Sequence, residues 1–97
     1  MSSKRPRTAP EVRSARIIER VRAIPKGFVR TYADIDPAAP RLVGRVLATT
    51  HEDLPWHRVV RADGTAPMGA PQLERLRHEG VPMRGNRVDL HQARLPG

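Results

Sequence analysis

Residues 31–47 read TYADIDPAAPRLVGRVL and contain two short amphipathic segments separated by a tight turn. Thr31 and Asp34 have the spacing of a helix capping box, which predicts a brief helix over the following residues. The prolines within 36–40 interrupt that helix, and the apolar periodicity that restarts near Arg41 predicts a second one. Two helices joined by such a turn are typical of a helix-turn-helix, although they also occur in other α-rich domains.

Upstream of this pair, an apolar face repeats at helical spacing between residues 12 and 24, which predicts a longer helix. Thr8 and Glu11 offer that helix a capping box, and the Pro-Lys-Gly turn at 25–27 ends it. Residues 1–8 carry three basic side chains and nothing to bury, so we expect them to form a flexible basic tail.

Downstream, the sequence predicts one helix and two tight turns. The Asp-Gly pair at 63–64 favours a hairpin, so residues 58–66 are expected to form a small wing. Residues 71–79 have helical periodicity, and Gly80 is placed to cap the end of that helix. A second turn is expected at the Gly-Asn pair at 85–86. The predicted fold is a mainly α-helical, winged-helix-like helix-turn-helix domain with a small β hairpin or sheet.

The length of the chain indicates how many domains it has, and its net charge indicates the kind of partner it binds. Ninety-seven residues make one domain, expected over 9–97 behind the tail. Lysine and arginine number 18 against 10 acidic residues, which gives a net charge of +8, and lysine occurs only at positions 4 and 26. A preference for arginine codons would explain the scarcity of lysine but not the net charge. The excess favours a polyanionic partner, with nucleic acid ahead of membrane.

Several chemistries are excluded or poorly supported by the residue types. The chain has no cysteine, which excludes disulfides, thiolate metal sites and cysteine nucleophiles. Its four histidines lack a regular metal-ligand spacing, and serine occurs only at 2, 3 and 14, which does not favour a hydrolase. No apolar run approaches the roughly 18 residues of a membrane span, and the N-terminus lacks a secretory h-region. We expect a cytoplasmic, nucleoid-associated protein without cofactor or metal.

Residues 55–64 read PWHRVVRADG and resemble the PCHRVV-x-x-x-G active-site motif of the O6-alkylguanine-DNA alkyltransferases. Three other segments resemble the same family in the same order. They are IPKGFVRTYADI at 24–35, RLVGRVL at 41–47 and ERLRHEG at 74–80. The resemblance spans residues 17–90, nearly the whole domain, and implies a DNA-binding helix-turn-helix fold.

Trp56 stands where this family has its nucleophilic cysteine, so the chain resembles the alkyltransferase-like subgroup. That subgroup binds alkylated DNA without repairing it. The chemistry of the residues agrees, because dealkylation needs a soft nucleophile and thiolate is the side chain suited to it. The indole N–H is a donor without an available lone pair, and no cysteine elsewhere can replace it. The resemblance therefore implies a protein that is not an enzyme.

The resemblance also implies roles for residues near the predicted turn. Arg41 matches an arginine finger that fills the space left by an extruded guanine, and its alternative is a plain phosphate contact. Tyr32 matches the tyrosine that helps to rotate the nucleotide out of the duplex, and its alternative is an ordinary core tyrosine. Thr31 and Arg45 are expected to contact DNA beside them.

Other positions match the lesion pocket and a relay in the family. Pro55, Trp56, His57 and Val59 are expected to surround the base on this ground, and Met68 and Gly69 are expected to complete the pocket from a loop that departs from the family pattern. His57 and Glu79 match a proton relay that would have no thiol to activate, so we expect them to keep a structural hydrogen bond. Arg58 is expected to tie the wing to the rest of the domain.

One region departs from the family pattern. Residues 65–72 read TAPMGAPQ, where active alkyltransferases have a glycine-rich loop that supplies a tyrosine and a serine near the lesion. Loss of that tyrosine should open the pocket, and Met68 is flexible enough to line it with adaptable apolar surface. We therefore expect tolerance of O6 substituents larger than methyl.

The leading hypothesis is a monomeric sensor of O6-alkylguanine in double-stranded DNA. It would flip the damaged nucleotide into a pocket and hand the lesion to nucleotide excision repair proteins. One alternative is a winged-helix transcription regulator that reads undamaged sequence with Arg41 and Arg45. Another is an enzyme with residual base chemistry, such as a glycosylase, for which His57 and Glu79 are the available acid or base.

Overall fold

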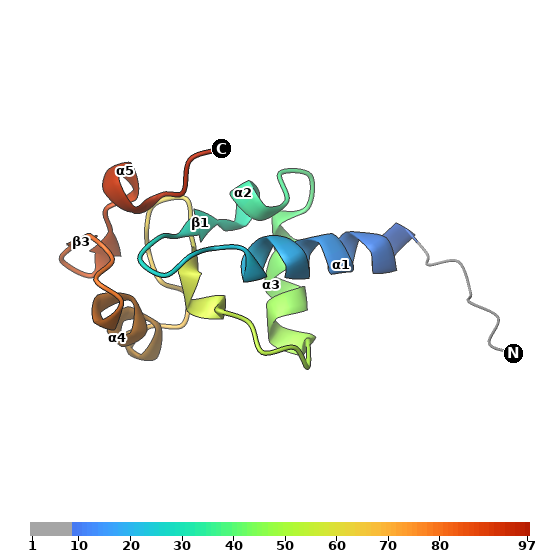
Figure 1. The fold of residues 1–97 in the computed structure, drawn as a ribbon, viewed down its shortest axis with the longest axis horizontal. Helices are drawn as coiled ribbons and strands as arrows, with labels where there is room; N and C mark the ends of the chain where they lie inside the picture. The colour runs from blue at the N-terminus through green and yellow to red at the C-terminus, as the bar shows by residue number, and fades with distance from the viewer. Residues whose placement is uncertain (1–8) are drawn as a thin grey trace, which may run out of the picture.

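The computed structural model describes residues 9–97, so the predicted tail at 1–8 and the capping box at Thr8 lie outside the described residues. The described part is mainly helical, which confirms the predicted fold class (Figure 1). Its helices are α1 (Ala9–Arg22), α2 (Tyr32–Ile35), α3 (Pro40–Thr49), the 3₁₀ turn η1 (Trp56–Arg58), α4 (Ala70–His78) and α5 (Leu90–Ala93). Its strands are β1 (Arg30–Thr31), β2 (Val59–Val60), β3 (Met83–Arg84) and β4 (Arg87–Val88).

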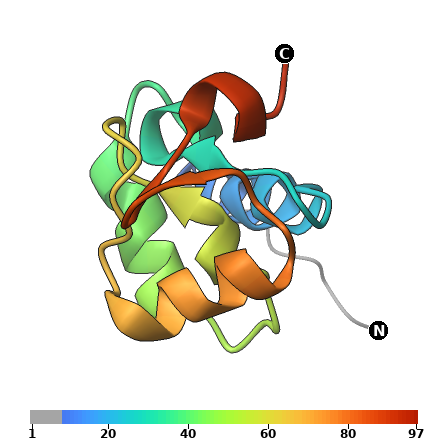
Figure 2. The same cartoon turned by 90° about the vertical axis from the view of Figure 1, so that its left-hand side faces the viewer.

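The core consists of two aliphatic clusters that meet at β2. One cluster joins the inner faces of α1, α2 and α3, and its buried members are Ile17, Val21, Ile24, Ile35, Val43, Val46, Leu54 and Val59. The other lies beneath α4 and the C-terminal segment, and its buried members are Val29, Val60, Leu76, Val81, Val88 and Ala93. Successive strand residues point to opposite faces, so Val59 and Val60 each enter a different cluster. From the end of the molecule, α4 and α5 lie on opposite sides of β2 (Figure 2).

The predicted helix pair is present as α2 and α3. Thr31 Oγ1 accepts from the Asp34 N–H at 3.1 Å, and Asp34 Oδ2 accepts from the Thr31 N–H at 3.0 Å, which confirms the capping box. Helix α3 begins at Pro40, where the missing N–H costs no intrahelical bond. A Cβ built on Gly44 would lie 3.8 Å from Tyr32 Cε1, which is an ordinary contact distance, so the tyrosine ring lies against α3 at this position.

Replacing Thr31 with alanine should lower the free energy of unfolding by about 1 kcal/mol, because the α2 cap is lost. Urea denaturation of the variant beside the wild type measures this. Thr49→Ala is the matched control, since Thr49 is exposed and its hydroxyl only donates to the Arg45 carbonyl within α3. We expect the control to stay within about 0.5 kcal/mol of the wild type. Equal losses in the two variants would contradict a capping role.

The prediction that residues 58–66 form a wing is wrong. Strand β2 pairs in parallel with β1, with Val59 opposite Arg30 and Val60 opposite Thr31. The Asp-Gly turn does form, since the Arg61 N–H donates to the Thr65 carbonyl at 3.0 Å, but Thr65 then bridges to β4. The physical reason is burial. Both valines of β2 are fully buried, whereas a wing strand would expose one face to water.

The other downstream predictions are confirmed. Gly80 ends the predicted helix in the left-handed region at φ +76°, where the Val81 N–H donates to the Leu76 carbonyl at 3.1 Å. The turn at 85–86 joins β3 and β4 as an antiparallel pair. Within residues 9–97, the helices are too short or too polar to cross a membrane.

Candidate nucleic-acid interface

An apolar hollow of about 540 Å³ opens beside α3. Helices α2, α3 and α4, the turn η1 and the loop before α4 contribute its walls, through Tyr32, Gly44, Leu47, Ala48, Trp56, Met68, Pro71 and Gln72. Its volume lies within the range of pockets that hold small molecules. The hollow joins the predicted helix-turn-helix to the PWHRVV segment, which are separate in sequence.

Trp56 forms one wall and is itself held by two neighbours. Its ring meets the His57 ring edge-on, with 5.9 Å between centroids and an interplanar angle of 85°. The Arg75 Cζ atom lies over the indole, 5.5 Å from the ring centroid. The half-buried indole therefore has protein groups beside it as well as the open hollow.

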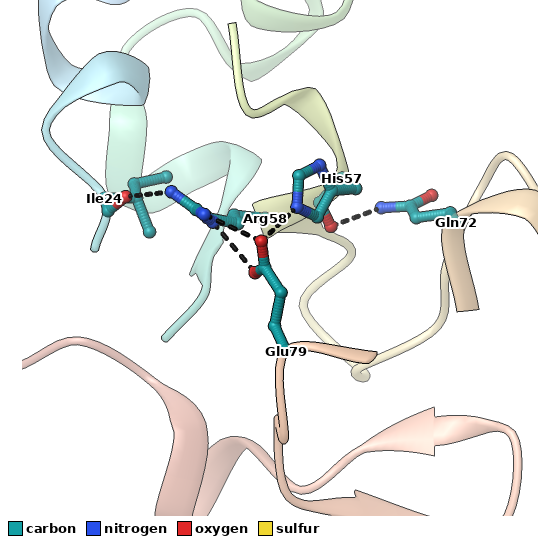
Figure 3. Close-up of polar contacts among 5 residues, drawn as sticks. All are labelled: Ile24, His57, Arg58, Gln72 and Glu79. Carbon is teal, nitrogen blue, oxygen red and sulfur yellow. Dashed lines mark hydrogen bonds and ion pairs between the residues drawn. The ribbon is translucent and has the colours of Figure 1, made fainter. Parts of the chain in front are cut away.

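A polar network joins His57 and Arg58 of η1 to Glu79 and to the segment after α1 (Figure 3). Glu79 Oε2 lies 2.9 Å from His57 Nε2, and the same carboxylate accepts from Arg58 Nε at 2.9 Å and Nη2 at 2.7 Å. Arg58 Nη1 also donates to the Ile24 carbonyl at 2.8 Å, which ties η1 to the segment after α1. The Arg58 guanidinium, and then the His57 ring, lower the pKa of Glu79 to about 2 despite its burial. Bonding to Glu79 in turn raises the pKa of Arg58.

Gln72 belongs to this site, although the sequence reading missed it. Its side chain is almost fully buried and donates from Nε2 to the carbonyls of His57 at 3.1 Å and Val59 at 2.8 Å. Its Oε1 accepts from the Met68 N–H at 3.1 Å, which fixes the loop at the mouth of the hollow. The available signal was its position four residues before the inward-facing Leu76, because a polar residue there has to find partners.

The six residues expected around the base do not all line the hollow. Trp56 and Met68 line the hollow, whereas Pro55, His57, Val59 and Gly69 do not. Val59 is fully buried in the core, and His57 is directed to Glu79. His57 Nδ1 is buried and has no hydrogen-bond partner within the described chain. His57, Arg58 and Glu79 are brought together as the resemblance implied.

The basic residues expected at the interface lie on the exposed side of α3. Arg41 and Arg45 are exposed and one helical turn apart, so both face the same way. Thr31, in contrast, is buried, and its hydroxyl is engaged in the α2 cap.

Arg61 is a basic residue of the interface that the sequence reading missed. Arg61 follows Val60, which pairs with Thr31, and its charge reaches the neighbouring Tyr32. Burial raises the pKa of the Tyr32 hydroxyl, and the Arg61 charge opposes that shift. The signal was its place directly after the PWHRVV motif.

Comparisons with known proteins agree with this geometry. The family model for the DNA binding domain of 6-O-methylguanine DNA methyltransferase matches residues 13–81. The chain is 42% identical over 91 residues to the DNA base-flipping protein of Escherichia coli K12, an alignment that covers 81% of this chain and 70% of that protein. It is 30% identical over 94 residues to alkyltransferase-like protein 1 of Schizosaccharomyces pombe, covering 84% of this chain and 87% of that protein.

A solved structure extends the agreement to the fold. The crystal structure of the Schizosaccharomyces pombe alkyltransferase-like protein in complex with damaged DNA containing O6-carboxymethylguanine matches with a TM-score of 0.76. That match is 26% identical and covers 89% of this chain and 96% of that chain. The helix-turn-helix fold and the family resemblance read from the sequence are thus confirmed. The chain belongs to the family defined by the DNA-binding domain of 6-O-methylguanine DNA methyltransferase.

Proposed function

We propose that this protein recognises O6-alkylguanine in duplex DNA by holding the extruded base in the hollow beside Trp56, without removing the alkyl group. The observation that carries the proposal is the apolar hollow between Tyr32 and Trp56. It lies beside helix α3, which exposes Arg41 and Arg45. A base inside a duplex cannot reach such a recess, so binding there requires the nucleotide to leave the stack.

Two residues are proposed to make extrusion less unfavourable. Unstacking and unpairing a base costs a few kcal/mol, and less when the base is damaged. Exposed Arg41 at the start of α3 is proposed to enter the duplex and fill the gap. Half-buried Tyr32 lines the hollow, its raised pKa keeps the hydroxyl neutral, and it is proposed to crowd the adjacent phosphate.

The site is poorly suited to chemistry on the base. Trp56 occupies the position of the acceptor thiol, and the chain contains no cysteine. A glycosylase would need an acid or base whose pKa lies near the working pH. The pKa of Glu79 is about 2 because Arg58 binds the carboxylate, so at neutral pH it is an ionised structural partner. A regulator that reads undamaged sequence would leave the hollow without a role.

An unrepaired lesion has to be passed to other proteins. We propose that the monomeric protein acts in the cytoplasm, on the nucleoid, and hands the bound lesion to nucleotide excision repair. Incision of a duplex with one O6-alkylguanine by purified excision-repair proteins would measure this step. Incision that is not accelerated by the protein would contradict the proposed transfer.

The proposed recognition is tested by competition between duplexes that differ only in the O6 substituent of one guanine. We expect at least a tenfold preference for the alkylated duplex, corresponding to roughly 1.4 kcal/mol. Because Met68 is exposed at the open mouth, binding should change little from methyl to bulkier groups. Mass analysis of protein and DNA from the same samples should show no transferred alkyl group and no released base. Equal binding of alkylated and unmodified duplexes would contradict lesion recognition, and a steep loss with substituent size would contradict an open pocket.

A further inference from the structure

We propose that Arg75 is a positioning residue for Trp56, whose guanidinium holds the indole in place as a wall of the hollow. This inference rests on the proposed function and adds to it a residue that discriminates between damaged and normal DNA. Arg75 is on α4, away from the helix-turn-helix, and nothing in the PWHRVV motif points to it.

Arg75 acts through the indole and not on an occupant of the hollow. Its Cζ atom lies 5.5 Å from the Trp56 ring centroid, but Arg75 is not among the residues that line the hollow. It lines instead a separate recess with His57 and Glu79. The indole therefore stands between the guanidinium and the space that would hold the base.

The indole needs such support because part of its surroundings is empty. A ring that borders a void has no packing atoms on that side and loses the corresponding dispersion contacts. Trp56 also begins a single three-residue 3₁₀ turn, which gives its side chain little shelter. Within residues 9–97, the Trp56 ring meets the His57 ring edge-on and has the Arg75 guanidinium over its face.

Three residues along one side of α4 and its C-terminal cap contact the segment formed by η1 and β2. Gln72 bonds the backbone carbonyls of His57 and Val59, and Glu79 binds the His57 and Arg58 side chains. Arg75 lies between these two along the helix, at the spacing that places all three on one face. The first two fix the backbone and the flanking side chains, and Arg75 supplies the contact to the indole itself.

Arginine is the side chain suited to this contact. The guanidinium is attracted to the face of an indole by the ring quadrupole, and its planar shape stacks where an ammonium group does not. The Arg75 guanidinium makes no hydrogen bond or ion pair with any residue from 9 to 97. Its contact with the Trp56 indole is therefore the interaction that holds it in this part of the chain.

The contact is tested first without DNA, because Trp56 is the chain's one tryptophan and reports on itself. In Arg75→Met, acrylamide should quench Trp56 fluorescence about twofold more effectively, since the ring gains freedom and access. Arg75→Lys keeps the charge but not the planar group, and should fall between methionine and wild type. Arg16→Met removes the same charge from α1, which does not line the hollow, and should leave quenching unchanged. Unchanged quenching in Arg75→Met would overturn the inference.

The consequence for recognition is tested with the same variants on alkylated and unmodified duplexes. Arg75→Met should reduce the preference for the alkylated duplex about two- to fivefold, the size expected of a cation–π contact. Arg16→Met should weaken both duplexes alike. Altered quenching with an intact preference would overturn the positioning role. A wild type without any preference would instead contradict the proposed function, and the quenching result would still decide whether Arg75 holds the ring.

Discussion

Replacing Arg41 with alanine should remove most of the preference for the alkylated duplex, a loss of about 10- to 100-fold. In the proposed complex the extruded nucleotide leaves a gap that costs a few kcal/mol, and Arg41 is the side chain proposed to fill it. Unmodified DNA, which is bound without extrusion, should lose only the contribution of one surface charge. Competition between the two duplexes at fixed salt measures the ratio directly, since affinity for any DNA falls as salt rises.

Arg45→Ala is the matched control for this prediction. Arg45 lies one turn further along α3, is also exposed, and carries the same charge. Because it is expected to contact only the phosphate backbone, its loss should weaken both duplexes by a similar factor. If Arg41→Ala and Arg45→Ala had the same effect on both duplexes, Arg41 would be an ordinary phosphate contact.

Replacing Glu79 with glutamine should destabilise the fold by about 3 kcal/mol at neutral pH. The Glu79 side chain is 11% exposed and that of Arg58 is 17% exposed, so the variant would leave a largely buried guanidinium without its counter-ion. The neutral amide also accepts more weakly from His57 and Arg58. Chemical denaturation of both proteins measures the difference. Glu74→Gln, an exposed change on the same helix, should have little effect.

The loss of stability caused by Glu79→Gln should become smaller as the pH falls. The pKa of Glu79 in the folded protein, about 2, lies below its ordinary value of 4.5. The ionised carboxylate therefore stabilises the fold fully above pH 4.5, and that contribution is lost as the pH falls from 4.5 towards 2. The difference between wild type and Glu79→Gln should shrink over this window, while other acidic groups titrate alike in both proteins. A difference that stays constant down to the acid end would contradict the ion pair.

The sequence predicted those parts of the fold that depend on local signals. The Thr31 and Asp34 capping box, the Gly80 cap and the 85–86 turn are each specified by a few neighbouring residues, and all three are present. The family motifs also predicted that His57 and Glu79 lie in the same site, and the two side chains are hydrogen-bonded.

The parts that could not be predicted depend on contacts between distant residues. The 58–66 segment has a good local turn signal, but burial of Val59 and Val60 between two clusters decided its pairing. Gln72 was not identified from the sequence because its partners are backbone carbonyls, which have no sequence signature. Arg75 could not be linked to Trp56 because no local pattern states which side chain lies over which ring.

The short β1–β2 pairing has a consequence for how the chain can vary in length. It closes residues 32–58 into a loop, because Arg30 lies opposite Val59 and Thr31 lies opposite Val60. Doubling the length of a closed flexible loop costs only about 0.6 kcal/mol of closure entropy. Tyr32 and Trp56 lie near the two anchored ends, so insertions at the exposed positions 37–38 or 51–53 should leave both residues beside the hollow. Helix α3 itself cannot be replaced in this way, because Gly44, Leu47 and Ala48 line the hollow. Changes in length are therefore expected only in the turns on either side of it.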